Sequence, residues 1–344
     1  MSNENHSLFN FYFCGLKPIK MKKIAVFSSG GDSPGMNACI RAVVRTAIYK
    51  GIEVYGIHRG YEGMIEGDIK RMQSYSVSNI VQRGGTILKS ARSAGFRTPE
   101  GRKKAYENLK EHGIEGIIAI GGDGTFAGAK LFFEEYGIPT LGCPGTIDND
   151  IFGTDYTIGF DTAVNTALEA IDKIRDTAAA HDRIFFIEVM GRDSGFIAVE
   201  CGIGGGAEFV MVPETKTDID LIVKSLKNLR KTKSSSIIVV AEGDEEGNAE
   251  VVMKKVQKKL NDKNKEFKVT TLGHIQRGGN PTARDRVLAS RCGMAAVEGL
   301  LAGHQFHMAG IVNQDVVYTT FADCIGRTKP LIADHLKLIE ILSI

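Results

Sequence analysis

Two short segments combine carboxylates with glycines or threonine in a pattern that suits phosphoryl transfer: Gly121–Thr125 (GGDGT) and Thr146–Asp150 (TIDND). In the first, Asp123 stands among glycines directly after an apolar run, where backbone N–H groups can approach a phosphate. A hard Mg²⁺ prefers one or two carboxylates together with phosphate oxygens and water. The segment therefore predicts a magnesium–polyphosphate site with Asp123 as the metal ligand.

The second segment offers a proton acceptor. Asp148 and Asp150 are two residues apart, which directs both carboxylates to one side if the backbone is extended. In a loose phosphoryl-transfer transition state the proton leaves late, so a weak base such as Asp148 suffices. An Asx-turn loop without a catalytic role would contain the same residue types. Taken alone, TIDND leaves both interpretations open.

A third segment, Gly30–Gly35 (GGDSPG), lies between an apolar run and a helical pattern, where an anion is favoured. A tight strand-to-helix turn explains its glycines equally well. Gly122–Ala127 fits the loose GxGxxA dinucleotide pattern, but no acidic residue ends a following strand at the distance that a ribose contact requires. No GK[ST] sequence is present, so a Walker loop is excluded.

Basic side chains further along the chain can neutralise a phosphorylated acceptor. They are Arg183, Arg192 in the segment MGR, and His274 with Arg277 in GHIQRGG. Arginine suits this role because its planar fork binds phosphate through two donors. An isolated histidine is more often a structural group than a ligand. His274 therefore indicates a substrate contact only in combination with the residues around it.

The elements that must position these residues alternate strands with helices. Strands are predicted at 24–28, 114–120, 184–191 and 235–243, and helices at 38–51, 161–180 and 220–230. The nearly continuous apolar run at 114–120 is typical of a strand buried on both faces of a parallel sheet. In helix 161–180, Val164, Leu168, Ile171 and Ile174 share one face, and Asp161 is the predicted N-cap. Two α/β domains are expected.

Composition narrows the class of protein. The 344 residues include 43 basic and 41 acidic ones, a net charge of +2, so no overall field attracts nucleic acid or an anionic membrane. The lysines of 254–268 are interpreted as the solvated face of a helix above Val252, Val256 and Leu260. No apolar run reaches about 18 residues, and six scattered cysteines without a CxxC pair indicate a reduced, cytoplasmic protein. Residues 1–20, which precede Met21 and the first strand, are expected to be a disordered extension.

Specific blocks recur in a fixed order over nearly all of Met21 to Pro330. They are GGD–PGMN, RGGT with SAR, GGDGT, PGTIDNDI–GTDYTIGFDTA, VMGR and LGHIQRGG. In this combination the chain closely resembles the phosphofructokinase family, in its bacterial ATP-dependent form (group A).

The resemblance implies a glycolytic kinase that transfers the γ-phosphoryl group of MgATP to the 1-hydroxyl of fructose 6-phosphate. It implies two Rossmann-like, three-layer α/β domains with largely parallel sheets and the active site in the cleft between them. The larger, nucleotide-binding domain would comprise 21–159 with about 276–326. The smaller, sugar-phosphate domain would comprise 160–275 with about 327–344. The subunits would form a homotetramer that shares active sites.

Site residues carry over by position. Asp148 would be the general base, assisted by Thr146 and Arg192, with Mg²⁺ on Asp123. The ATP site would comprise Gly31, Arg92, Ser93, Gly122, Asp123, Gly124 and Thr125. Fructose 6-phosphate would contact Thr146, Asp148, Met190, Gly191, Arg192, Glu242, His274 and Arg277, with Arg183 and Lys268 supplied by a neighbouring subunit.

The choice of phosphoryl donor follows from two glycines. Pyrophosphate-using relatives have an acid in place of Gly124, which crowds the ATP α-phosphate, and a lysine in place of Gly145, which grips the short donor. We therefore expect ATP. A pyrophosphate-dependent enzyme and a non-catalytic regulatory homologue are the alternatives, and NAD or lipid kinases and dehydrogenases lie further away.

Two departures from the family pattern have consequences. Lys268 stands where the family usually has arginine, so the charge remains but the fork is lost, and weaker fructose 6-phosphate binding is expected. An effector site for ADP or phosphoenolpyruvate would use Arg41, Arg45, Arg175, Lys231 and Lys233. Ser74 replaces one expected arginine of that site, and the chain diverges after Pro330. Weak or altered effector control is expected.

Overall fold

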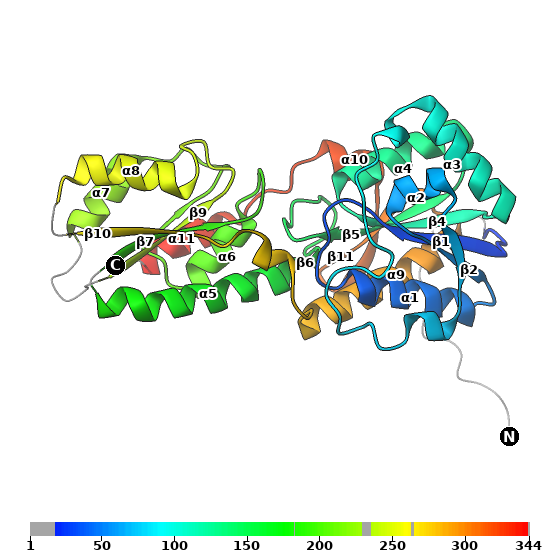
Figure 1. Ribbon diagram of the computed structural model, residues 1–344, viewed down its shortest axis with the longest axis horizontal. Coiled ribbons are helices and arrows are strands. Elements are labelled where there is room, and N and C mark those ends of the chain that lie inside the picture. The colour runs from blue at the N-terminus through cyan, green and yellow to red at the C-terminus, as the bar shows by residue number, and fades with distance from the viewer. Residues whose placement is uncertain (1–17, 182, 229–234, 263–264, 343–344) are drawn as a thin grey trace, which may run out of the picture.

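Two sheets organise the chain, and helices cover both faces of each (Figure 1). The computed structural model describes residues 18–181, 183–228, 235–262 and 265–342. In the described chain the larger sheet has the strand order β12-β11-β5-β4-β1-β2-β3, with β6 paired to β5. Its strands are β1 (Lys23–Ser28), β2 (Glu53–Ile57), β3 (Ile69–Met72), β4 (Gly116–Gly121), β5 (Thr140–Thr146), β6 (Ile158–Gly159), β11 (Phe306–Val312) and β12 (Asp315–Thr320). Pairing is parallel except at the two edges, β2–β3 and β11–β12.

Alternation along β1 shows why this sheet is a middle layer. Ile24 and Val26 join the core beneath one set of helices, and Ala25 and Phe27 join the core beneath the other. Successive side chains of a strand point to opposite faces, so an uninterrupted apolar strand needs cover on both. One face carries α1 (Met36–Tyr49) and α9 (Ala283–Ala302), and the other carries α2 (Gly60–Glu66), α3 (Pro99–His112), α4 (Asp123–Tyr136) and α10 (Phe321–Gly326).

The smaller sheet is built in the same way. Its strand order is β10-β7-β9-β8, and all described pairs are parallel. The strands are β7 (Arg183–Val189), β8 (Phe209–Met211), β9 (Ser236–Ala241) and β10 (Glu266–Thr271). One face packs against α5 (Phe160–Ala180), α6 (Phe196–Gly204) and α11 (Ala333–Leu342), and the other against α7 (Ile219–Asn228) and α8 (Ala249–Leu260). The predicted α/β class with two largely parallel, three-layer units is confirmed.

The chain passes between the two sheets at three places. It runs from β6 into α5, through the short helix η3 (Gly273–Arg277) into α9, and through residues 327–332 from α10 to α11. These passages lie close to the expected domain limits, which stay a prediction. The separation of the two lobes and the thin connections between them are visible in Figure 1.

The helices α5, α7 and α8 agree with the sequence predictions in part. The apolar face of α5 packs as expected, but the N-cap prediction for Asp161 is wrong, because the cap is Gly159 in a left-handed conformation (φ 107°). Asp161 lies in the first turn and accepts a hydrogen bond from Thr282 Oγ1 at 2.6 Å. In α8, Val252, Val256 and Leu260 are buried and the lysines from Lys254 to Lys259 are exposed, so the solvated-face interpretation is confirmed there. It is wrong for Lys268, because the helix ends at Leu260 and Lys268 lies on strand β10. The helix predicted at 220–230 is described as far as Asn228.

The start of the described chain is attached to the larger lobe. Ile19 N–H donates to the Leu301 carbonyl at 2.8 Å, and Ile19 packs against the core beneath α9. The first 17 residues of the predicted extension lie outside the described residues. Within the described ranges, no helix combines the length and the apolar character that crossing a bilayer requires.

Candidate active site

The predicted catalytic segments meet where strands end. β1, β4 and β5 are parallel neighbours, so their carboxyl ends deliver the loops 30–35, 121–125 and 146–150 to one edge of the larger sheet. From the smaller sheet, β7 ends before Met190, β9 before Glu242 and β10 before η3. A cavity of about 1270 Å³ lies between these two sets of ends. Of the predicted residues it is lined by Gly31, Arg92, Ser93, Gly122, Asp123, Gly124, Thr125, Thr146, Asp148, Met190, Arg192, Glu242, His274 and Arg277.

The space around the glycines of GGDGT differs from one position to the next. A Cβ on Gly121 would stand 2.6 Å from the Ser29 carbonyl, so close packing of two loops excludes a side chain there. Around Gly124 a Cβ would meet nothing within 4 Å. Gly124 therefore keeps space open in the cavity rather than serving the fold, as expected at a ligand.

Gly145, like Gly121, is closely surrounded by other atoms. Its Cβ would lie 3.0 Å from Met36 Cε and 3.1 Å from Ile120 Cγ2. Gly145 also lines the cavity, so packing gives this glycine a structural reason beside its predicted role in donor choice. Gly124 differs from it in lying beside open space, which an acidic side chain could occupy.

The TIDND loop is not extended. β5 ends at Thr146, and Asn149 is left-handed (φ 55°), so the premise of an extended pair of aspartates is wrong. Asp148 N–H donates to Thr146 Oγ1 at 3.2 Å, and Ser194 Oγ donates to the Asp148 carbonyl at 3.0 Å. The Asp148 side chain is buried, and its Oδ1 has no hydrogen-bond partner among the described residues. A buried acceptor without a partner is rare in folded proteins, which marks this atom for a ligand.

Three carboxylates at this edge have raised proton affinity. Burial raises the pKa of Asp148, while Arg277, the Thr146 hydroxyl and Arg192 oppose the shift. Burial, together with repulsion from Asp148 and Asp123, raises the pKa of Asp150 to about 6. Burial also raises the pKa of Asp123, against the attraction of Arg192. Such clustering of acids with raised pKa values is typical of sites that receive a cation or a proton.

A magnesium ion fits this donor set if phosphates complete its shell. Among the described residues no group of three His, Cys, Asp or Glu side chains could enclose a metal. Mg²⁺ needs no such cage, because it retains water and binds one or two carboxylates with substrate phosphates. Asp123, in the first turn of α4 beside the open space at Gly124, meets that requirement.

The smaller lobe contributes a strained loop. Gly191 (φ 145°) and Arg192 (φ 54°) both have a positive φ, and their N–H groups donate to Glu242 Oε1 at 3.3 and 2.8 Å. Residues held in such conformations cluster at functional sites. The Glu242 carboxylate thus orients the loop from which Arg192 enters the cavity.

Arg277 joins the two lobes. Its Nη1 donates to the Asp32 carbonyl at 3.3 Å and would lie 2.6 Å from a Cβ on Gly31. A side chain at position 31 would displace this guanidinium, so Gly31 leaves room for Arg277 in the position seen here.

Two predicted substrate contacts lie elsewhere on this chain. Arg183 begins β7, about 20 Å from the end of that strand by its residue rise. Arg183 Nε and Lys268 Nζ both contact Glu266, at 2.7 Å each, and neither lines the cavity. Gly191 is also absent from the lining and acts through its backbone.

The predicted effector residues are spread over several elements. Arg41 and Arg45 lie on α1, and Ser74 begins the short helix η1 (Ser74–Val77). Arg175 on α5 donates to the carbonyls of Gly205 and Gly206. Lys231 and Lys233 lie outside the described residues.

The cavity also contains residues that sequence reasoning missed. Tyr61 and Phe96 stack with ring centroids 4.0 Å apart, and the Tyr61 hydroxyl donates to the Thr125 carbonyl at 2.6 Å. Together with Arg97 and Leu131 they form a wall beside the glycine loop. No glycine or carboxylate pattern marks these positions, and only the fold brings them together.

Comparison with known proteins agrees with this geometry. A family model described as Phosphofructokinase matches residues 23–300. The ATP-dependent 6-phosphofructokinase of Cytophaga hutchinsonii is 58% identical over 324 residues, which cover 94% of this chain and 98% of that protein. The ATP-dependent 6-phosphofructokinase 1 of Thermus thermophilus is 56% identical over 325 residues, covering 94% of this chain and 100% of that protein.

Solved structures share the fold. A phosphofructokinase from Saccharomyces cerevisiae matches with a TM-score of 0.83 and 35% identity, covering 89% of this chain and 45% of that one. A pyrophosphate-dependent phosphofructokinase from Marinobacter aquaeolei matches with a TM-score of 0.79 at 23% identity, covering 94% and 91%, a likeness of fold alone. On the family match and the extent of these identities, this chain belongs to the phosphofructokinase family.

Proposed function

We propose that this chain is an ATP-dependent 6-phosphofructokinase, which converts ATP and fructose 6-phosphate into ADP and fructose 1,6-bisphosphate. The names of relatives at 58% and 56% identity support the proposal. The observation that carries it is the Asp148 carboxylate, buried and with Oδ1 unpartnered among the described residues, at the wall of a cavity shared with GGDGT and with Arg192.

Asp148 serves as the general base. It accepts the proton from the 1-hydroxyl of the sugar as that oxygen bonds to the γ-phosphorus in line with the departing ADP oxygen. Arg277 and Arg192 favour the ionised carboxylate and so keep it able to accept a proton despite burial. Arg192, which also lies in the field of Asp123, neutralises charge on the phosphoryl group.

Magnesium completes the donor side. Asp123 would hold the ion together with the nucleotide phosphates, and Gly31, Arg92, Ser93 and 122–125 would contact the nucleotide. When bound, the ion neutralises phosphate charge and stabilises the departing oxygen. ATP rather than pyrophosphate is the proposed donor because Gly124 leaves open the space that an acidic side chain would occupy.

The sugar phosphate would be bound by Thr146, Asp148, Met190, Gly191, Arg192, Glu242, His274 and Arg277. Arg183 and Lys268 lie away from the cavity of their own chain, which supports a role in the site of a neighbouring subunit. We therefore propose a homotetramer with shared active sites. We also propose a cytoplasmic location, no nucleic-acid or membrane partner, and weak effector control through Arg41, Arg45, Arg175, Lys231 and Lys233.

A coupled assay tests the function. Purified protein with Mg²⁺ and fructose 6-phosphate should form the bisphosphate with ATP and not with pyrophosphate. Turnover with pyrophosphate alone would identify the other donor class. Absence of turnover with either donor, with both substrates still binding, would identify a non-catalytic homologue.

A further inference from the structure

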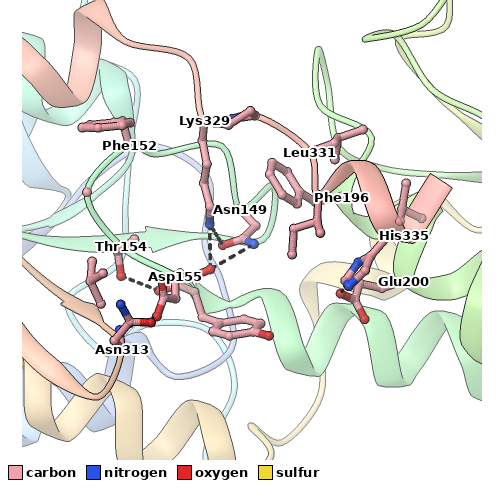
Figure 2. A pocket seen from close by; sticks show the side chains of 16 residues that line it. Asn149, Phe152, Thr154, Asp155, Phe196, Glu200, Asn313, Lys329, Leu331 and His335 are labelled. Carbon is pink, nitrogen blue, oxygen red and sulfur yellow. Dashed lines mark hydrogen bonds and ion pairs between the residues drawn. The ribbon is translucent and has the colours of Figure 1, made fainter. Parts of the chain in front are cut away.

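Lys329 is a lysine in an apolar setting on the segment that joins the two lobes. The segment 327–332 runs from α10, which packs on the larger lobe, to α11, which packs on the smaller one. It borders a second cavity, of about 520 Å³, whose walls include Phe152, Tyr156, Phe196 and Leu331 (Figure 2). The ammonium lies over the Phe196 ring, 4.9 Å from its centre, where the ring face attracts the cation while the side chains of Phe152 and Leu331 offer no hydrogen-bond acceptor. A cation in such surroundings is costly unless its contacts compensate.

The contacts of Lys329 converge on the loop that contains the proposed base. Its Nζ donates to Asn149 Oδ1 at 3.0 Å and to the Asp155 carbonyl at 2.7 Å. Asn149 Nδ2 in turn donates to the same Asp155 carbonyl at 3.4 Å. Figure 2 shows the ammonium pointing at these two oxygens, so lysine, amide and carbonyl close a small ring.

Asn149 occupies a conformation that needs support. It is left-handed (φ 55°), directly follows Asp148, and is 3% exposed. Its Oδ1 also accepts from Thr157 N–H at 3.0 Å, so one amide oxygen joins three segments of the chain. Non-glycine residues persist in this backbone region where surrounding contacts fix them. Lys329 supplies the one charged donor among the contacts described for this amide.

Two acidic residues of the described chain, Asp155 and Asp150, act on the charge of the Lys329 ammonium. Burial lowers the pKa of Lys329 to about 8, and Asp155 and Asp150 oppose the shift. At the far end of the cavity the His335 ring lies 3.8 Å from Glu200 Oε1. Lys329 is half-buried, and its ammonium is turned inward to the two oxygens that it contacts.

We infer that Lys329 is a positioning residue for phosphoryl transfer: from the interdomain segment it holds Asn149, and through Asn149 it fixes the backbone that aims the Asp148 carboxylate. The inference rests on the proposed function. Asp148 is anchored from the other side by Ser194 Oγ, which comes from the smaller lobe, so contacts from both sides determine where the base stands. The arrangement of the two lobes is thereby linked to the geometry of proton transfer.

The first test substitutes the ammonium. Lys329→Met retains the apolar stem and removes the donors, and we expect kcat to fall on the order of 10-fold, since a base displaced by about 1 Å costs up to about 100-fold. The KM for ATP should stay within about two-fold, because the nucleotide loop is not contacted. Lys329→Arg should recover part of kcat. Lys337→Met, an exposed lysine on α11, is the matched control and should change neither constant.

A double-mutant cycle decides whether Lys329 acts through Asn149. Asn149→Gly keeps the left-handed backbone accessible and removes the acceptor. If the inference is correct, Lys329→Met lowers kcat much less in the Asn149→Gly background than in the wild type. Additive losses would overturn it, as would an unchanged kcat in Lys329→Met. If Lys329→Met does not fold, Lys329→Gln replaces it in the cycle. An inactive wild type would instead refute the proposed function, so the two failures are distinguishable.

Discussion

Replacing Asp148 with asparagine separates catalysis from binding and stability. The exchange preserves volume and leaves the two hydrogen bonds that Thr146 Oγ1 and Ser194 Oγ make with the Asp148 backbone. What disappears is the proton acceptor and one negative charge. The variant should therefore fold and should still bind both substrates.

The expected loss of turnover follows from burial. General-base removal lowers rates by about 10²- to 10⁴-fold. The late proton departure of a loose transition state argues for the lower end, and a side chain only 4% exposed, which solvent cannot replace as base, argues for the upper. We expect kcat to fall about 10³-fold, which corresponds to about 4 kcal/mol of activation free energy.

The same substitution should increase the free energy of unfolding. Asp148 is buried at a desolvation cost, and its charge helps to raise the pKa of Asp150 to about 6. Removing that charge relieves both effects in the ligand-free enzyme, so we expect a gain on the order of 1 kcal/mol, as active-site substitutions often give.

Steady-state kinetics, substrate titration and denaturant unfolding test these expectations together. Asp315→Asn, at an exposed position of β12, is the control and should behave as the wild type. Full activity of Asp148→Asn would refute the assignment of the base. Loss of substrate binding with lower stability would refute the claim that the backbone, rather than the carboxylate, fixes the loop.

Three further substitutions probe the remaining assignments. Lys268→Arg should lower the KM for fructose 6-phosphate, by an amount equivalent to about 1 kcal/mol of binding free energy, because a two-donor guanidinium replaces a single ammonium. An unchanged or higher KM would contradict this. Gly124→Asp should raise the KM for ATP without lowering the melting temperature, because its Cβ meets open space; Gly326→Asp, also unobstructed, is the control. The kcat of the wild type should fall as the pH rises through about 8, where Lys329 changes from charged to neutral, and a pH–rate profile of Lys329→Arg should lack this limb.

The sequence was sufficient where function depends on the ends of strands. GGDGT and TIDND follow apolar runs directly, so a parallel sheet had to bring Asp123 and Asp148 to one edge. The residues that contact these two loops cannot be predicted from the ends of strands. Lys329 contacts Asn149 across 180 residues, and the pair Tyr61 and Phe96 forms only when α2 and the segment before α3 pack together.

Interpretation from residue type alone is ambiguous where the same residue type can have two different structural roles. Asp161 fits an N-cap by type, but the chain needed a left-handed residue there and used Gly159 two positions earlier. At Gly145 two explanations coexist: it lines the cavity, as a donor-selecting glycine would, and the contacts around it also leave no room for a side chain. The spacing of residues in the sequence cannot decide between the explanations at either position, because the decision depends on contacts with distant segments.

Glu266 gives the two distant cations an internal counter-ion. Its hydrogen bonds with Arg183 and Lys268 lower its pKa to about 2, so it is ionised at neutral pH. In the proposed shared site, Arg183, Lys268 and Glu266 together would present the sugar phosphate with a net charge of +1, where the two cations alone would present +2. In that site the weaker field would lower affinity for the incoming sugar phosphate and would equally ease release of the doubly phosphorylated product, which favours turnover over retention.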